Sequence, residues 1–217
     1  AKAAVEAVKV GGAFEEGVTM GPVSSKAQLD TVTNYIQQGI DEGATLVTGG
    51  TTPPEGRNTG YFVQPTVFSD VRNDMVIAQE EIFGPVLATI TFEDEDDAIA
   101  QANDSPYGLS ASVFSGDAER AEAVAVQLDC GAVNINDVIS NLMCTTAPMG
   151  GWKSSGMGVR FGGAEGIRKF CRQEAVVAPR TNVGAGGNYY NNSLRALKRM
   201  NTMMTKMALI GPRRAAK

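Results

Sequence analysis

Apolar residues in the first part of the chain recur at helical spacing between residues 26 and 42. Four of them fall on one face of a helix, namely Leu29, Val32, Ile36 and Ile40. The preceding stretch Ser25-Lys26-Ala27-Gln28 has the form of a capping box, in which the Ser and Gln side chains satisfy free backbone N–H groups. Gly43 follows at a position typical of a helix end. The pattern therefore predicts an amphipathic helix between Ser25 and Gly43.

Downstream, short apolar runs alternate with stretches of helical spacing. The runs predict strands at residues 44–47, 62–68, 86–92, 109–114, 131–135 and 174–177. The helical stretches lie at residues 2–10, 73–80, 94–102, 117–128 and 164–171, with a loop at Asn136–Trp152. Alternation of this kind is typical of an α/β layer sandwich with a mostly parallel sheet. We expect this fold for residues 1–180.

The remaining residues differ in composition. Residues 181–192 are rich in Gly and Asn, which predicts a flexible linker, and residues 193–217 form a basic tail that is helical from Ser193. The apolar stripe of this helix consists of Leu194, Leu197, Met200, Met204 and Met207. Such a stripe fits an anionic membrane surface or a protein surface. Because Met-rich stripes are adaptable packing surfaces, the pattern favours packing on this protein or on a second subunit over membrane contact.

Charge divides the chain at the same place. Residues 1–180 hold 12 Lys and Arg against 24 Asp and Glu, a net charge of −12, whereas residues 181–217 hold 7 Lys and Arg and no acid. The chain has no His, which argues against a metal site, a metallohydrolase or a Ser-His-Asp enzyme. Three unpatterned cysteines suit the reducing cytoplasm. The sequence indicates no signal peptide, no membrane span and no nucleic-acid partner.

The stretch Gln79-Glu80-Glu81-Ile82-Phe83-Gly84-Pro85 precedes the apolar run at residues 86–92. Gly-Pro makes a rigid junction, because Gly allows unusual backbone angles and Pro fixes φ. A carboxylate on such a corner can accept hydrogen bonds from a diol such as a ribose, and the ring two residues further on can lie against a flat cofactor. The same residues also fit a solvated helix end with Phe83 in the core.

Five stretches in a fixed order resemble motifs of the aldehyde dehydrogenase superfamily. They are Gly60–Phe68, Glu80–Pro85, Ala102–Asp104, Tyr107–Leu109 and Pro148–Gly156. The resemblance covers residues 1–178 and implies the carboxyl-terminal portion of that family's catalytic domain, a three-layer α/β sandwich here truncated at its amino terminus. It also implies that Glu81 binds the nicotinamide ribose of NAD or NADP and that Phe83 lies beside the nicotinamide.

The resemblance assigns the loop Asn136–Met149 to the aldehyde pocket. Ile139-Ser140-Asn141 is similar to a segment of succinate-semialdehyde dehydrogenases whose Ser holds the distal carboxylate of the substrate. Because the loop length differs, Thr145 or Thr146 is an alternative, and Met149 at the loop end is a further substrate-binding candidate. An ordinary polar loop fits the residues equally well.

The family's reaction converts an aldehyde, NAD(P)⁺ and water into a carboxylate and NAD(P)H through a Cys thiolate. The resemblance implies that this Cys lies in a Gly-Gln-x-Cys motif upstream of residue 1, so we expect no catalytic residue in this chain and no activity from it alone. The expected partners are the missing amino-terminal portion, a small aldehyde such as succinate semialdehyde, and further copies in a homo-oligomer. A non-catalytic scaffold or interaction module derived from the same fold is the alternative.

Overall fold

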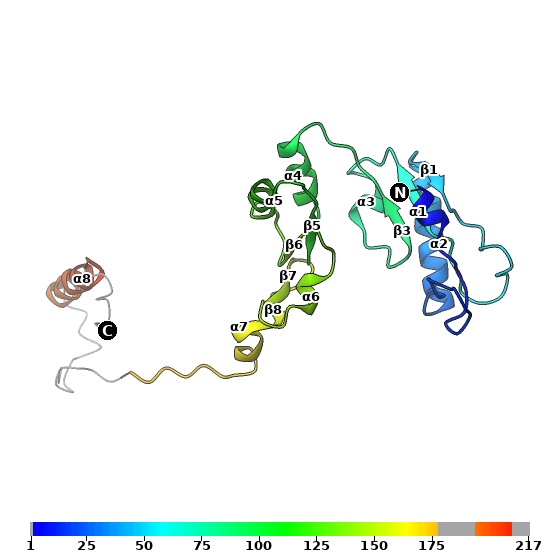
Figure 1. The fold of residues 1–217 in the computed structure, drawn as a ribbon. Helices are drawn as coiled ribbons and strands as arrows, with labels where there is room; N and C mark the ends of the chain where they lie inside the picture. Colours follow the sequence, from blue (N-terminus) through cyan, green and yellow to red (C-terminus); the bar gives the residue numbers. More distant parts are fainter. Residues whose placement is uncertain (1, 178–193, 210–217) are drawn as a thin grey trace. The chain divides into compact units, whose positions relative to one another are not determined.

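The computed structural model describes residues 2–177 and 194–209, which fall into two compact units, Ala1–Cys171 and Arg172–Lys217. Within the described part of the second unit there is one helix, α8 (Leu194–Leu209). The elements of the first unit, in chain order, are α1 (Lys2–Glu6), α2 (Lys26–Asp41), β1 (Thr45–Thr48), β2 (Thr66–Ser69), α3 (Val76–Gln79), β3 (Val86–Ala88), α4 (Glu95–Asn103), β4 (Tyr107–Gly108), β5 (Ala111–Val113), α5 (Ala118–Ala125), β6 (Val133–Ile135), α6 (Ser140–Met143), β7 (Met149–Lys153), β8 (Gly158–Phe161) and α7 (Gly163–Arg168) (Figure 1).

The predicted amphipathic helix is α2. The Ser25 side chain accepts a hydrogen bond from the backbone N–H of Gln28 at 3.1 Å, which satisfies one free donor of the first turn. Val32 and Ile36 are fully buried on the apolar face. The chain leaves the helix at Gly43, whose φ of +92° is readily adopted only without a side chain. The start and the end of this helix are as predicted, and so are Val32 and Ile36 on its buried face, whereas Ile40, which was expected on the same face, is exposed.

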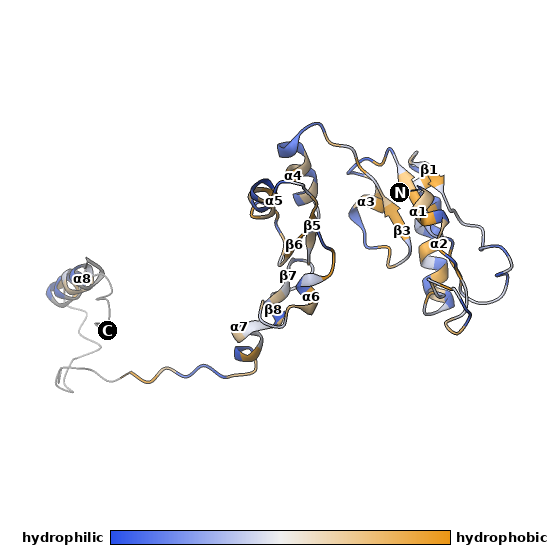
Figure 2. Cartoon of the chain, in the orientation of Figure 1, coloured by the Kyte–Doolittle hydropathy of each residue, from blue (hydrophilic) through white to orange (hydrophobic). Residues whose placement is uncertain are grey.

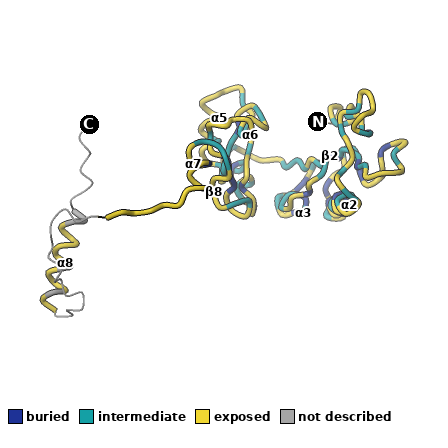
Figure 3. Tube along the Cα trace, turned by 90° about the horizontal axis from the view of Figure 1, so that it is seen from below, coloured by how far each residue is buried: buried dark blue, intermediate teal, exposed yellow. Residues whose placement is uncertain are grey.

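The core of the first unit lies where α2 and α3 pack on a three-stranded sheet. Its strand order is β1-β2-β3, with β2 antiparallel to β1 and parallel to β3. Phe68 on β2 is completely buried, and its neighbours include Ile36, Met75 and Ile77. Figure 2 shows the apolar residues concentrated on β1, β3 and the adjoining part of α2, and Figure 3 shows buried segments at α2, α3 and β2.

The other strands of the described residues form two small sheets. β5 pairs with β6 in parallel, whereas β4-β7-β8 is antiparallel throughout. A mostly parallel sheet was therefore a wrong expectation for the described residues, because the ladders β1–β2, β4–β7 and β7–β8 are all antiparallel. The chain is an α/β protein with several small mixed sheets.

The largest differences from prediction lie after residue 148. β7 and β8 occupy stretches expected to be a loop and a glycine-rich bend, and the strand expected at residues 174–177 is not formed. Glycine explains the first difference, since a Cβ on Gly150 would lie 1.9 Å from the Gly158 carbonyl oxygen. The linker expected at 181–192 lies outside the described residues. Among the described helices, none has the length and apolar character needed to cross a membrane.

Candidate functional site

A tight turn at residues 80–84, between α3 and β3, is held by contacts on both sides. Ile82 is buried in the core beside α2. The Gln28 side-chain amide donates hydrogen bonds to the carbonyl oxygens of Ile82, at 3.2 Å, and Phe83, at 3.1 Å. Gly84 approaches α2 so closely that a Cβ would lie 2.5 Å from a methyl group of Val32. The turn is therefore fixed against the first two turns of α2.

This turn forces the Phe83 ring outward. Phe83 has φ +53°, in the left-handed region that costs an L-residue about 1–2 kcal/mol, and its side chain is 73% exposed. The alternative in which Phe83 belongs to the core is wrong, because the core position in this turn belongs to Ile82. An exposed aromatic ring on a strained backbone is common at ligand sites and costly elsewhere.

The two neighbouring carboxylates have different surroundings. Glu80 accepts a hydrogen bond of 2.6 Å from the Tyr35 hydroxyl, and this bond raises the pKa of Tyr35. Glu81 is exposed, and its side chain has no hydrogen-bond or ion-pair partner among the described residues. Glu80 thus fastens the turn to α2, whereas Glu81 can accept hydrogen bonds from a ligand.

Glu80 and Glu81 face a cavity of about 330 Å³. Its walls come from the end of α3, the end of α4, the segment around β4 and β5, and the chain between α5 and β6. The lining residues are Ala78, Gln79, Glu80, Glu81, Ala102, Asn103, Ser105, Tyr107, Gly108, Leu109, Ser110, Ala111, Leu128, Asp129, Cys130 and Ser155. Four of the five sequence motifs contribute to this wall. The cavity is polar on the Glu81 side and apolar around Leu109 and Leu128.

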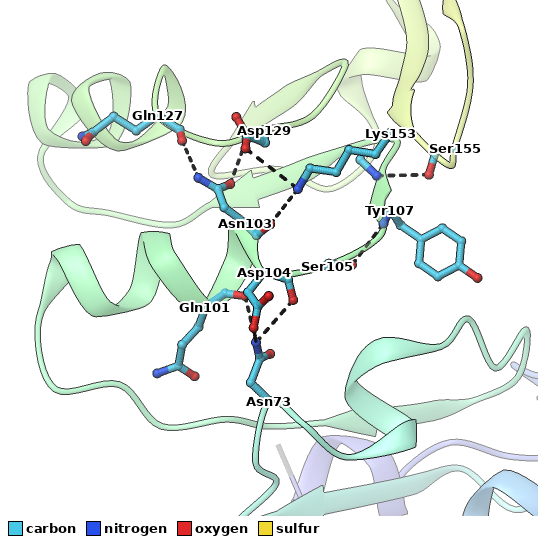
Figure 4. A network of polar contacts seen from close by, with 11 residues as sticks. Asn73, Gln101, Asn103, Asp104, Ser105, Tyr107, Gln127, Asp129, Lys153 and Ser155 are labelled. Carbon is cyan, nitrogen blue, oxygen red and sulfur yellow. Dashed lines mark hydrogen bonds and ion pairs between the residues drawn. The ribbon is translucent and has the colours of Figure 1, made fainter.

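Polar contacts tie the turn to the opposite wall. The Gln79 amide donates to the carbonyl oxygens of Asn73, at 2.7 Å, and Asp104, at 2.8 Å. The Asn73 amide in turn donates to the Asp104 carboxylate at 3.1 Å (Figure 4). Because Gln79 directly precedes the two glutamates, these bonds fix the α3 end of the turn relative to the loop after α4.

The same network continues to β7. Lys153 has φ +49°, and its ammonium group donates to the Asn103 carbonyl oxygen at 2.7 Å and lies 3.9 Å from the Asp129 carboxylate. The Asn103 side chain donates to the Gln127 carbonyl oxygen and accepts from the Asp129 N–H, both at 2.8 Å. Residues of the Ala102–Asp104 and Pro148–Gly156 motifs therefore meet around one loop. Their polar side chains mainly form hydrogen bonds and ion pairs within the protein (Figure 4).

The predicted substrate loop lies elsewhere in the first unit, since none of Ser140, Thr145 and Met149 lines the cavity beside Glu81. Ser140 begins the short helix α6, and its backbone N–H donates to the Asp137 carboxylate at 2.6 Å. Backbone hydrogen bonds from Ile139, together with contacts from Ser140, lower the pKa of Asp137. Thr145 is exposed, whereas Met149 is buried at the start of β7.

The three cysteines are all free thiols, and their surroundings differ. Burial raises the pKa of Cys130, whose sulfur contacts the Ala132 carbonyl oxygen at 3.2 Å. Cys144 is exposed in the substrate loop, and a 3.4 Å contact with the Thr146 hydroxyl lowers its pKa. Cys171 is exposed as well. No group of three potential metal ligands lies together within the described ranges.

Two residues that hold the turn were missed by the sequence reasoning. Gln28 was interpreted as the return half of a capping box, but its amide bonds to the turn 54 and 55 residues away instead. No sequence pattern indicated a contact between Tyr35 and the turn, since Tyr35 was recognisable only as a residue of α2 next to the buried Ile36. Both contacts depend on how α2 packs beside the turn, which local sequence does not reveal.

Comparisons with known proteins identify the family of this chain. The family model described as "Aldehyde dehydrogenase family" matches residues 1–176, so the chain belongs to the aldehyde dehydrogenase family. A putative aldehyde dehydrogenase of Staphylococcus haemolyticus is 48% identical over 169 residues, which cover 78% of this chain and 35% of that protein. The chain thus spans about a third of the length of the curated relatives it matches.

Solved structures give the same result. The Mycobacterium tuberculosis aldehyde dehydrogenase complexed with NAD⁺ is 44% identical, with a TM-score of 0.77 over 82% of this chain and 36% of that one. The Staphylococcus aureus betaine aldehyde dehydrogenase in complex with NAD⁺ is 39% identical, with a TM-score of 0.72 over 77% of this chain and 33% of that one. A Pseudomonas syringae aldehyde dehydrogenase complexed with NAD⁺ and octanal is 41% identical, with a TM-score of 0.72 over 76% and 33%.

Proposed function

We propose that this chain is the carboxyl-terminal portion of the catalytic domain of an NAD(P)-dependent aldehyde dehydrogenase. The observation that carries the proposal is the turn at residues 80–84, which leaves the Glu81 carboxylate without a protein partner among the described residues and turns the Phe83 ring outward. Relatives that are 39–44% identical are solved with NAD⁺. In this proposal residues 1–180 form the enzymatic part, residues 181–192 a linker and residues 193–217 a separate tail.

Glu81 and Phe83 have complementary roles toward the nicotinamide half of NAD or NADP. The Glu81 carboxylate accepts hydrogen bonds from the ribose hydroxyls, because no neighbouring donor in the described part of the chain competes for it. The Phe83 ring lies against the nicotinamide face. When bound, the cofactor accepts a hydride from the substrate. Gln28, Tyr35 and Gly84 keep both side chains in position by fixing the turn on α2.

The loop Asn136–Met149 is proposed to line the aldehyde pocket, with succinate semialdehyde as the candidate substrate. Thr145 suits the distal carboxylate better than Ser140, because its hydroxyl is exposed and has no hydrogen-bond partner among the described residues. Ser140 contacts the ionised Asp137, which would repel a second carboxylate. Met149, which is buried at the start of β7, would contribute an apolar side chain to the aldehyde pocket.

The nucleophilic thiolate and the general base are proposed to come from the remaining part of the parent enzyme. Exposed apolar side chains support a covering partner, since Phe92, Phe114 and Trp152 are each more than half exposed. The same portion would complete the small sheets into a three-layer sandwich and would support a homo-oligomer. The chain alone is expected to oxidise no aldehyde.

A chimeric enzyme tests the proposal. The matched 169 residues of the S. haemolyticus relative would be replaced by the corresponding part of this chain. We expect the chimera to produce NADH or NADPH when supplied with an aldehyde. In it, Glu81→Gln should reduce turnover about 10- to 150-fold, since a hydrogen bond to a charged acceptor contributes about 1.5–3 kcal/mol.

Glu80→Gln is the matched control. The amide oxygen introduced at this position can still accept the Tyr35 hydrogen bond, so turnover should remain within about threefold of the chimera. Equal losses in the two variants would show that Glu81 has no special role. An inactive chimera with a native melting temperature would contradict the assignment of this chain to the enzyme's catalytic portion.

Phe83→Gly separates positioning from stability. Glycine relieves the left-handed backbone, worth about 1–2 kcal/mol, but adds about 0.4–1 kcal/mol of unfolded-state entropy. We therefore expect an unchanged or slightly raised melting temperature together with lower turnover. Phe114→Gly, at a position with a similarly exposed ring and ordinary φ, should lower the melting temperature. A large destabilisation by Phe83→Gly would give the ring a structural role.

A further inference from the structure

The helix α8 has features that the proposed enzyme does not use. It lies outside residues 1–176, which the family model matches. The sequence from residue 181 to residue 217 holds 7 Lys and Arg and no Asp or Glu. An inference about α8 is therefore independent of the proposed catalytic function.

Basic and apolar side chains occupy opposite sides of α8. Successive helical residues are about 100° apart, so the four basic residues fall within an arc of about 100°. Leu197 and Met204 lie on the other side of the helix, whereas Met203 lies on its flank beside Arg199. The exposed side chains on the two sides are Arg195, Lys198, Arg199 and Lys206, and Leu197 and Met204.

The uncharged part of the basic side needs no external partner. The Thr202 hydroxyl donates to the Lys198 carbonyl oxygen at 2.9 Å, and the Thr205 hydroxyl donates to the Asn201 carbonyl oxygen at 2.8 Å. No carboxylate exists within residues 194–209 to pair with the basic groups. The features of α8 that remain unsatisfied are therefore its positive charges and its Leu/Met side.

A lipid–water interface offers partners to both sides of such a helix at once. At a lipid–water interface the apolar side enters the acyl boundary while Lys and Arg reach the headgroups along their flexible stems. Anionic headgroups then attract each nearby basic residue.

We propose that α8 binds the surface of a membrane rich in anionic lipid, lying in the plane of that surface. Leu197 and Met204 enter the acyl boundary, and the four basic side chains contact the headgroups. The sequence pattern favoured a protein surface for the apolar stripe. The opposite placement of the two unsatisfied sides, with no acid between them, is the reason for assigning lipid instead.

Vesicle sedimentation of the full chain tests the proposal. The probes are vesicles of phosphatidylcholine alone and of phosphatidylcholine with about 30% phosphatidylserine, the latter about the composition of an anionic leaflet. We expect binding to the anionic vesicles, loss of it at high salt, and little binding to the neutral ones. Replacing two charges in R195Q/K198Q should weaken partitioning about 25-fold.

Two further variants separate apolar insertion from charge alone. L197Q/M204Q keeps the charge but removes apolar side chains, and it should weaken partitioning about 30-fold or more. T202Q/T205Q also introduces two Gln residues, but on the polar side and without altering the charge or the apolar surface. Its partitioning should stay within about threefold of that of the parent chain. Circular dichroism should show the same fold in all variants.

The opposite results are equally specific. Unchanged binding of L197Q/M204Q would mean that charge alone holds the helix on vesicles, without insertion. Equal binding to neutral and anionic vesicles would show that the basic side chains gain nothing from anionic headgroups. No vesicle binding by the full chain, together with a changed oligomeric state on deletion of residues 182–217, would assign α8 to a protein surface. Each of these results would overturn the proposal.

Discussion

Replacing Gln28 by Ala is expected to loosen the turn that presents Glu81 and Phe83. The Gln28 amide makes two hydrogen bonds to that turn, to the carbonyl oxygens of Ile82 at 3.2 Å and Phe83 at 3.1 Å. A hydrogen bond contributes about 0.5–1.5 kcal/mol net to stability. The bond to Phe83 is exposed, so water can partly replace what is lost. The free energy of unfolding should therefore fall by about 1–2 kcal/mol.

Thermal unfolding followed by circular dichroism measures this change. In a domain of this size, 1 kcal/mol corresponds to about 2–4 °C, so Gln28→Ala should lower Tm by about 2–8 °C. Hydrogen exchange should also accelerate at the backbone amides of residues 82–84 and of Val86, because the turn loses its attachment to α2.

Gln37→Ala provides the matched control on the same helix. Gln37 is exposed and bonds only to Asp41, one helical turn away, at 2.8 Å, among the described residues. Such a pair contributes about 0.2–0.5 kcal/mol, and the gain in helix propensity from Gln to Ala is the same at both positions. Equal Tm shifts in the two variants would refute the reasoning, since the long-range bonds of Gln28 would then contribute nothing beyond a local pair.

Two further changes test other parts of the molecule. Gly84→Ala should cost about 1–3 kcal/mol in unfolding free energy, because its Cβ would lie 2.5 Å from a methyl group of the fully buried Val32, whereas Gly116→Ala meets no atom within 4 Å and should leave Tm nearly unchanged. Thr146→Val should raise the pKa of Cys144 by removing the hydroxyl contact that lowers it, so the pH of half-maximal alkylation, measured by mass spectrometry, should move upward; an unchanged pH profile would contradict this cause.

Local sequence determined the helix α2 and drew attention to the turn at residues 80–84. Apolar spacing at Val32 and Ile36 fixes the buried face whatever it packs against, and Ser25 fixes the start through a bond to a residue three positions away. The resemblance of residues 80–85 to a family motif made Glu81 and Phe83 candidates, whereas their chemistry alone also fitted a solvated helix end. These inferences were possible because they depend on contacts within a few residues or on residue type.

Tertiary structure decided what these residues contact. Residue type alone does not distinguish the two adjacent glutamates, and Glu81 was selected by the family resemblance. In the structure Tyr35, 45 positions away, bonds to Glu80, and Glu81 is left without a partner among the described residues. The glycine-containing strands β7 and β8 were not predicted from the sequence, because they depend on close approach of distant backbone segments. For example, a Cβ on Gly131 would lie 1.6 Å from the carbonyl oxygen of Gly150 on β7. The expected strand at residues 174–177 has strand-like composition, yet a strand forms only when a neighbouring backbone accepts its hydrogen bonds.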